Sequence, residues 1–154
     1  KNYPPNYLAL TELVAEREID IGMAFNIAHA SNAISEGKLP NTVRSYIHKD
    51  GTLANVHFLA IPNNSGKKTA AKVFVNFLIS PEAQLKKQDK TFWGDPSVIS
   101  VAKLDKNWKN KFTTLPRGIA TLSNEELKMK LEEPHPSWVK IIEEGWIERY
   151  GSNN

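Results

Sequence analysis

Polar and aromatic side chains stand beside the apolar segments of this sequence, at positions where they could contact a small ligand. Asparagine offers hydrogen-bond donors and an acceptor, and an aromatic ring offers a face for stacking. In open α/β sheets, ligands bind beyond the carboxyl ends of the strands. Each of these side chains taken alone is more often a cap, a turn residue or part of the core. As a group they are our candidates for a ligand-binding site: Phe25, Asn26, Asn32, Asn55 and Trp93.

The segment 61–69 has the outline of a phosphate-binding loop, because it lies between an apolar segment and a predicted helix. A phosphate-binding loop requires a glycine, four further residues and then Gly-Lys-Ser/Thr. Here Ile61 stands at the first glycine position and Lys68 at the position of the magnesium-binding hydroxyl. The segment is therefore better interpreted as a loop in which Ser65 caps a helix.

No pattern of catalytic or metal-binding residues is recognisable in the rest of the sequence. There is no cysteine, which excludes disulfides, thiolate metal sites and cysteine nucleophiles, and there is no HExxH or G-x-S-x-G motif. His48 and His57 flank a predicted hairpin and could lie close together, but exposed or hydrogen-bonded histidines are the stronger interpretation. We therefore predict no catalytic residue, no metal and no cofactor.

The composition is that of a globular chain with a modest positive charge. Its 154 residues carry 20 Lys and Arg against 17 Asp and Glu, a net charge of +3, and the pI is about 9.1. The basic residues are scattered along predicted helix faces, which favours a solvated surface over a nucleic-acid-binding face. No apolar run approaches the roughly 20 residues of a membrane-spanning helix. The first residue is Lys1, without a signal-like segment, which fits either a removed targeting segment or a fragment.

Apolar periodicity predicts alternating helices and strands in the first half of the chain and mostly helices afterwards. The clearest pattern is at 66–79, where apolar residues recur at i, i+3, i+4, i+7 and i+8. Ser80 followed by Pro81 predicts a cap and the start of a second helix that runs to about 88. The remaining helices are predicted at 6–18, 31–36, 105–112, from 123 and through 138–146, and strands at 19–25, 42–48 and 56–61.

These elements predict an α/β fold, with few strands followed by a helical C-terminal region. An independent sheet usually contains about five or six strands, whereas three are predicted here. We therefore expect the chain to need strands that its own sequence does not supply.

The segment 75–84, Val-Asn-Phe-Leu-Ile-Ser-Pro-Glu-Ala-Gln, resembles the signature of type-2 periplasmic solute-binding proteins. In that family an apolar strand, an Asn/Ser/Gly loop and an Ala-rich helix precede the signature, and residues 58–71 follow the same order. The resemblance extends over nearly the whole chain and is closer to the YnjB-type subfamily. The segments that carry it are 19–26, 30–32, 39–44, 51–61, 93–96 and 133–138.

The resemblance implies a periplasmic solute-binding component of an ABC importer, and not an enzyme. It implies the C-terminal portion of a two-lobed type-2 periplasmic-binding-protein fold, with a missing N-terminal half that supplies further strands. Residues 1–49 would end the second lobe, 50–55 would form a hinge crossing, and 56–154 would complete the first lobe with bracing helices. The partners would be a small-molecule solute in the inter-lobe cleft and the membrane permease, and the protein would act as a monomer without nucleic acid.

Two other functional classes stay open on the residues alone. A basic α/β module for nucleic acid would show a clustered basic face, and a single-domain α/β enzyme would show a strained nucleophile or a perturbed acid–base pair. Neither pattern is recognisable in the sequence. The portion also shows no Tyr-Tyr pair of the iron-binding type, and a cleft lined by Asn and aromatic residues would suit a small polar organic molecule.

Overall fold

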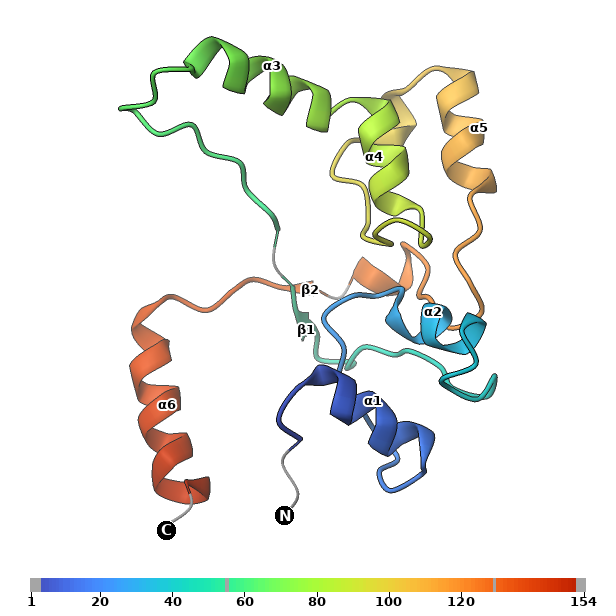
Figure 1. Cartoon of the computed structure of the whole chain (residues 1–154), viewed down its shortest axis with the longest axis vertical. Helices are drawn as coiled ribbons and strands as arrows, with labels where there is room; N and C mark the ends of the chain where they lie inside the picture. The colour runs from blue at the N-terminus through green and yellow to red at the C-terminus, as the bar shows by residue number, and fades with distance from the viewer. Residues whose placement is uncertain (1–3, 55, 129, 152–154) are drawn as a thin grey trace. The chain divides into compact units, whose positions relative to one another are not determined.

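The computed structural model describes residues 4–54, 56–128 and 130–151 of the chain. The chain divides into two compact units, one drawn from residues 1–46 and 59–124 and the other from residues 47–58 and 125–154. Figure 1 follows the elements of both units along the chain. In the described ranges no helix combines the length and the apolar composition that a bilayer crossing requires.

The larger unit is built from helices, most of which the sequence predicts. Their starts have clear chemical causes: the Asn6 side chain accepts a hydrogen bond from Ala9 N at 3.0 Å, and Asp105 accepts one from Trp108 N at 3.0 Å. The break at residue 80 is confirmed, because Ser80 caps a helix that has proline as its first residue. The helices are α1 (Tyr7–Ala15), α2 (His29–Ser35), α3 (Lys68–Leu78), α4 (Pro81–Gln88) and α5 (Lys106–Thr114), with a 3-10 turn at Val101–Lys103.

The smaller unit contains two short parallel strands, β1 (Thr52–Leu53) and β2 (Lys130–Leu131), and helix α6 (Ser137–Tyr150). Gly51 precedes β1 with φ +102°, and a Cβ there would lie 2.7 Å from the Leu131 side chain, so the turn predicted at 50–51 requires glycine. The helix predicted from residue 123 is a 3-10 turn at Glu126–Lys128.

The strands predicted at 19–25, 42–48 and 56–61 are wrong as paired strands. In the described parts of the chain these segments are neither helical nor part of a sheet, and β1 with β2 forms the sheet that is present. An extended segment becomes a strand only when a neighbour takes up its N–H and C=O groups. Apolar alternation predicts the preference for extension, but it does not provide the neighbour.

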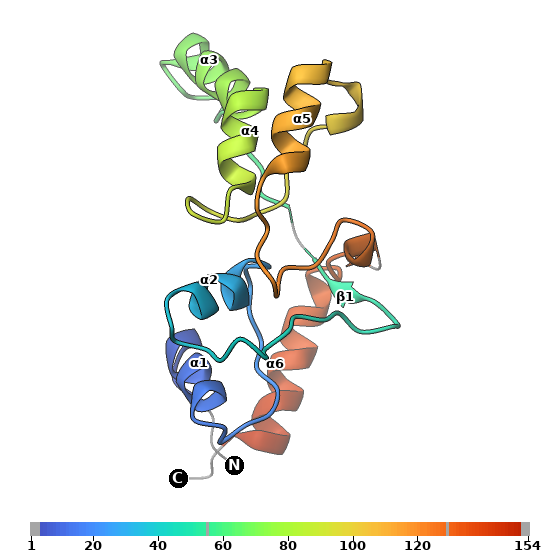
Figure 2. The same cartoon turned by 90° about the vertical axis from the view of Figure 1, so that its right-hand side faces the viewer.

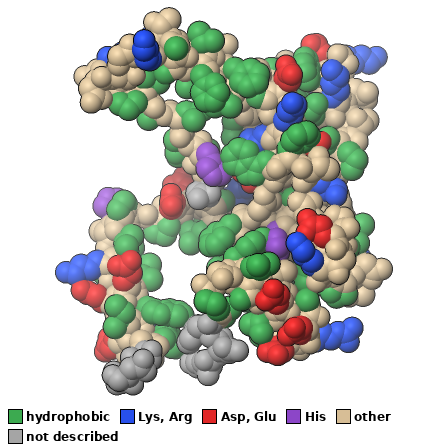
Figure 3. All heavy atoms as spheres, in the orientation of Figure 1, with side chains coloured by type: hydrophobic (Ala, Val, Ile, Leu, Met, Phe, Trp, Pro, Cys, Tyr) green, Lys and Arg blue, Asp and Glu red, His purple; other side chains and the backbone are tan. Residues whose placement is uncertain are grey.

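Among the described residues, three of the six buried apolar side chains of the larger unit are alanine. In the described residues no large side chain has less than 2% of its surface exposed. The apolar stripe of α3 is open, with Val73 68% and Phe74 59% exposed, and α6 likewise carries exposed apolar residues. Figure 3 shows hydrophobic side chains on the visible surface over α3 and α6. The buried apolar residues of the unit are Ala28, Ala33, Leu39, Phe112, Ala120 and Leu122.

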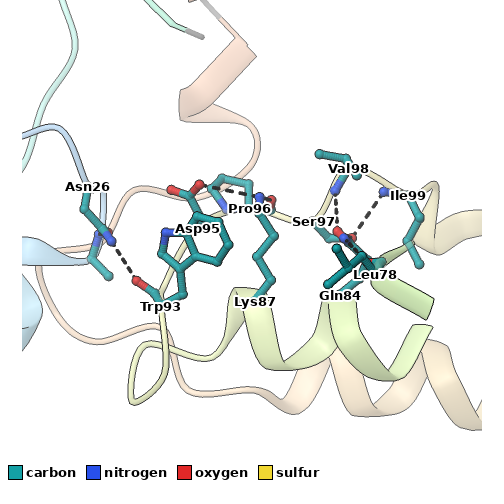
Figure 4. Close-up of polar contacts among 11 residues, drawn as sticks. Asn26, Leu78, Gln84, Lys87, Trp93, Asp95, Pro96, Ser97, Val98 and Ile99 are labelled. Carbon is teal, nitrogen blue, oxygen red and sulfur yellow. Dashed lines mark hydrogen bonds and ion pairs between the residues drawn. The ribbon is translucent and has the colours of Figure 1, made fainter. Parts of the chain in front are cut away.

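Helix α4 organises the loops that follow it. Gln84 is buried; its amide nitrogen donates to Leu78 O at 2.8 Å and its amide oxygen accepts from Val98 N at 2.9 Å (Figure 4). The loop around residue 98 is thereby fixed to α4. The chain then returns through α5, which runs beside α4 in both views (Figures 1 and 2).

A histidine joins α1 to α2. His29 Nε2 lies 3.0 Å from the hydroxyl oxygen of Thr11, and the His29 ring lies 4.4 Å from that of Tyr7, centroid to centroid. Burial lowers the pKa of His29, the nearby Glu36 carboxylate opposes this shift, and Lys38 adds to it. Burial also raises the pKa of Tyr7. The junction therefore favours the neutral imidazole.

We expect acid to weaken this junction. The pKa of His29 in the folded chain lies below its unfolded value of about 6.5, so protonation of His29 favours the unfolded chain. The stabilisation from neutral His29 is complete above the unfolded pKa and is lost as the pH falls through the folded-state pKa. Urea unfolding at about pH 7.5 and about pH 5 would measure this loss. His29→Gln should reduce the pH dependence, whereas the matched His135→Gln at an exposed position should keep it. An equal loss of unfolding free energy between the two pH values in both variants would contradict the role of His29.

Candidate functional site

Two asparagines hold the loop that follows α4, and this loop carries Trp93. Asn26 Nδ2 donates to Trp93 O at 2.6 Å, and Asn32 Nδ2 donates to Lys90 O at 2.9 Å. The amide oxygen of Asn26 also accepts from Ala28 N at 2.7 Å (Figure 4 shows the bond to Trp93). Both side chains therefore fix the 89–96 loop against the start of α2.

A glycine allows the loop to approach α2 closely. Gly94 has φ +82°, a conformation that side chains with a Cβ rarely adopt. A Cβ built on Gly94 would also collide with the Cβ of Ala28, which is buried. Backbone conformation and lack of space thus both require glycine at this position.

The Trp93 ring rests beside a partly buried ion pair. Lys87 Nζ lies 5.2 Å from the Trp93 ring centroid, 3.5 Å from an oxygen of Asp95 and 2.7 Å from Pro96 O (Figure 4). The Lys87 and Asp95 side chains are 13% and 19% exposed, so solvent screens their attraction less than it would on an open surface. The ring itself remains accessible, since Trp93 is 46% exposed.

A third segment approaches α2 through Ser31. Ser31 Oγ lies 2.7 Å from Thr121 Oγ1 and accepts a hydrogen bond from Ala120 N at 3.1 Å. Gly118 has φ +88°, and a Cβ there would collide with the Ser31 side chain. The 117–121 loop and the 89–96 loop therefore both lie against the region of α2, although they are distant in the sequence.

A polar hollow lies where these segments meet. Its volume is about 10 Å³, room for roughly one water molecule. Its lining contains two cations and no carboxylate, and both cations are partly buried. The residues that line the hollow are Ile27, Ala28, Gln88, Lys90, Gly94, Pro96, Arg117 and Thr121.

A larger groove of about 610 Å³ lies at the start of α3, but we do not place the site there. It is lined by residues 65–70 and Val73, which belong to one short stretch of chain, so no second segment forms an opposing wall. The polar hollow, in contrast, brings together three segments with convergent polar groups. In the described ranges no group of three His, Asp or Glu side chains could hold a metal ion.

The structure brings three of the five predicted site residues together and leaves the side chain of a fourth exposed. Asn26, Asn32 and Trp93 meet at the 89–96 loop, where the two amides bond to backbone groups. The Phe25 side chain is 88% exposed. Asn55 lies outside the described residues. Ligand contact by these residues stays a prediction.

Sequence reasoning missed the two cations of the polar hollow. Lys90 and Arg117 lie in separate loops, and nothing in their immediate sequence distinguishes them from the other basic residues. The glycines that follow Trp93 and Arg117 are a partial signal, because Gly94 and Gly118 both mark a close approach to the α2 region. The glycines indicate which loops pack against α2, but they do not indicate that Lys90 and Arg117 line the hollow.

Substituting Gly94 tests how tightly the loop is held. We expect Gly94→Ala to lower the free energy of unfolding by about 2 kcal/mol or more, because it adds a left-handed backbone penalty to a steric collision. Gly66→Ala is the matched control, since a Cβ at Gly66 meets no atom within 4 Å, and its effect should stay within about 0.5 kcal/mol. Urea unfolding followed by circular dichroism compares the two. Equal effects would mean that the loop does not pack closely on Ala28.

Comparison with known proteins finds a matching family and a similar protein that is longer than this chain. The sequence model of a family described as bacterial extracellular solute-binding protein matches residues 8–114, more than half of the chain. Protein YnjB of Escherichia coli (strain K12) is 37% identical over 153 residues, which cover 99% of this chain and 38% of that protein. The chain therefore spans less than half the length of this relative. No solved structure gives a significant match.

The matched region includes the residues that hold the loop, namely Asn26, Asn32, Lys90 and Trp93, and it contains the 75–84 segment. The match confirms the family that this segment predicts. The chain belongs to the bacterial extracellular solute-binding protein family.

Proposed function

We propose that the protein containing this chain is the extracytoplasmic solute-binding component of an ABC importer. In this proposal a monomer captures a small solute in a cleft between two lobes and delivers it to the membrane permease. The observation that carries the proposal is the family match over residues 8–114. Because the chain covers 38% of Protein YnjB, the cleft and the permease-docking surface are proposed for a longer protein than the 154 residues described here.

The proposed lobes are those predicted from the sequence. Residues 1–49 end the second lobe, 50–55 cross the hinge, and 56–154 complete the first lobe with bracing helices. The chain leaves the larger compact unit at 46–47 and returns to it at 58–59, so these two transitions flank the proposed crossing, while residues 1–46 and 59–124 belong to one unit. Gly51, with φ +102°, has the backbone freedom that a hinge residue uses.

We also propose that the extended segments 19–25, 42–48 and 56–61 pair with strands from the rest of the longer protein. The exposure of their apolar side chains supports this: Met23 is 68% exposed and Phe58 88% exposed. Such side chains are stabilised when a sheet and its covering helices remove them from water. The exposed stripe of α3 would face the same completed core.

Within the cleft we propose two kinds of role for the predicted site residues. Trp93 and Phe25 offer exposed rings for contact with the solute, and Asn55 offers an amide. Asn26 and Asn32 bond to the backbone of the 89–96 loop, which suits them to holding Trp93 in place. Capture forms and breaks no covalent bond, since closure of the lobes around the solute depends on contacts that the open form does not make.

Thermal unfolding of the longer natural protein with a panel of small solutes tests the proposal. A solute that binds the folded state raises its stability by about 2.7 kcal/mol when present at 100 times its Kd, so one compound should raise the melting temperature in a dose-dependent way. Trp93→Ala should weaken that compound's binding about tenfold or more, as expected for a buried aromatic contact. The matched control is Trp108→Ala on α5. A panel without any stabilising solute would contradict the proposed function.

A further inference from the structure

The cations of the polar hollow have no charged partner among the residues that the structure describes. In the described part of the chain no carboxylate forms an ion pair with Lys90 or Arg117; the one hydrogen bond from the Arg117 side chain goes to the neutral amide oxygen of Asn124, at 3.1 Å. Both side chains are half-buried. Partial burial of a cation costs solvation, and a nearby anion compensates for that cost.

The acidic residues of the 89–96 loop are engaged with other groups. Asp95 lies 3.5 Å from Lys87 Nζ, and Asp89 accepts hydrogen bonds from the backbone nitrogen and the hydroxyl of Thr91, at 2.9 and 2.8 Å. Neither acid lines the hollow. Both charged residues that line the hollow are therefore cations, and neither of these acids joins them in the lining.

Neutral donors add to this positive lining. Thr121 lines the hollow, and its hydroxyl shares a 2.7 Å hydrogen bond with Ser31. When Ser31 is the donor in that bond, Thr121 keeps its own hydrogen for an acceptor in the hollow. An acceptor that carries negative charge matches this set of groups better than a neutral one, because hydrogen bonds to a charged acceptor are stronger.

The size of the hollow limits what can enter it. A volume of about 10 Å³ holds roughly one water molecule, so it can take one oxygen atom of a ligand and not a whole solute. The rest of the ligand must lie outside. Gly94 lines the hollow, and the preceding residue, Trp93, has an accessible ring that could contact such a ligand.

We propose that the solute captured by this protein carries a carboxylate or phosphate group, one oxygen of which enters the hollow between Lys90 and Arg117. This inference rests on the proposed function and deepens it, because it names the chemical class of the solute. It also assigns roles to Lys90 and Arg117, which the five residues predicted from the sequence do not include.

The experiment uses the longer natural protein and a panel of solutes in matched pairs. Each carboxylic acid is paired with its amide, each phosphate monoester with the free alcohol, and inorganic phosphate is added alone. Calorimetric titration then ranks the members. We expect the anionic member of one pair to bind the protein and its neutral partner to bind at least tenfold more weakly. Comparison of the carboxylic acids with the phosphate monoesters then shows which of the two anionic groups the protein recognises.

Charge-removing variants connect the binding to the hollow. Lys90→Gln and Arg117→Gln should each lower the affinity for the anionic solute by about 10- to 100-fold, as expected for loss of one charge-assisted hydrogen bond. Lys109→Gln, at an exposed position of α5, is the matched control and should change the affinity less than twofold. Lys90→Arg keeps the charge and should retain most of the binding, which separates loss of charge from loss of folding.

The outcomes distinguish this inference from the function on which it rests. A neutral solute that binds with equal affinity to the parent protein and to both Gln variants would overturn the inference and leave solute capture standing. A panel in which nothing binds would contradict solute capture itself, and the inference with it.

Discussion

The need of extended backbone for hydrogen-bonding partners is the constraint on which the rest of this structure depends. Segments 19–25, 42–48 and 56–61 have the apolar character of strands, yet in the described parts of the chain they stay outside any sheet. Without a sheet to cover, the apolar stripe of α3 remains open, and no large side chain in the described residues is fully buried. A strand gains its hydrogen bonds and its burial together, so the lack of a neighbour removes both. The short pair of β1 and β2 shows that pairing occurs where two segments do meet.

The larger unit compensates through polar side chains that join segments distant in the sequence. Asn26 and Asn32 bond to the 89–96 loop, Ser31 meets the 117–121 loop, and Gln84 fixes the loop around residue 98. A hydrogen bond of this kind contributes only about 0.5–1.5 kcal/mol, but leaving a buried polar group without a partner costs more. The bonds of Asn26, Asn32 and Ser31 hold together the segments that line the polar hollow. Loop placement and the proposed recognition of the solute therefore depend on one set of contacts.

Local sequence signals predicted the helices well and the sheet poorly. Asn6, Ser80 and Asp105 begin helices through contacts within three residues, so their effect can be read from the sequence. A strand depends on a partner at long range, and alternation at 19–25 carries no information about where that partner lies. The candidate site, like the fold, is only partly predictable from the sequence. The positions of Asn26, Asn32 and Trp93 beside apolar segments predict a site, and these residues converge in the structure, whereas Lys90 and Arg117 become distinctive only after the chain folds. The family was predictable because the segment 75–84 is itself local.

Amide hydrogen exchange tests most directly whether strands from a longer protein complete this fold. The comparison is between the 154-residue chain alone and the longer natural protein, with α4 as an internal reference because its amides bond within the helix. We predict that most amides in segments 19–25, 42–48 and 56–61 exchange rapidly in the chain alone and become strongly protected in the longer protein, since protection follows the free energy of opening a hydrogen bond. The amides of Val43, Ser45 and His48 already donate hydrogen bonds in the chain and are left out of this comparison. Rapid exchange of all three segments in both proteins would contradict the account.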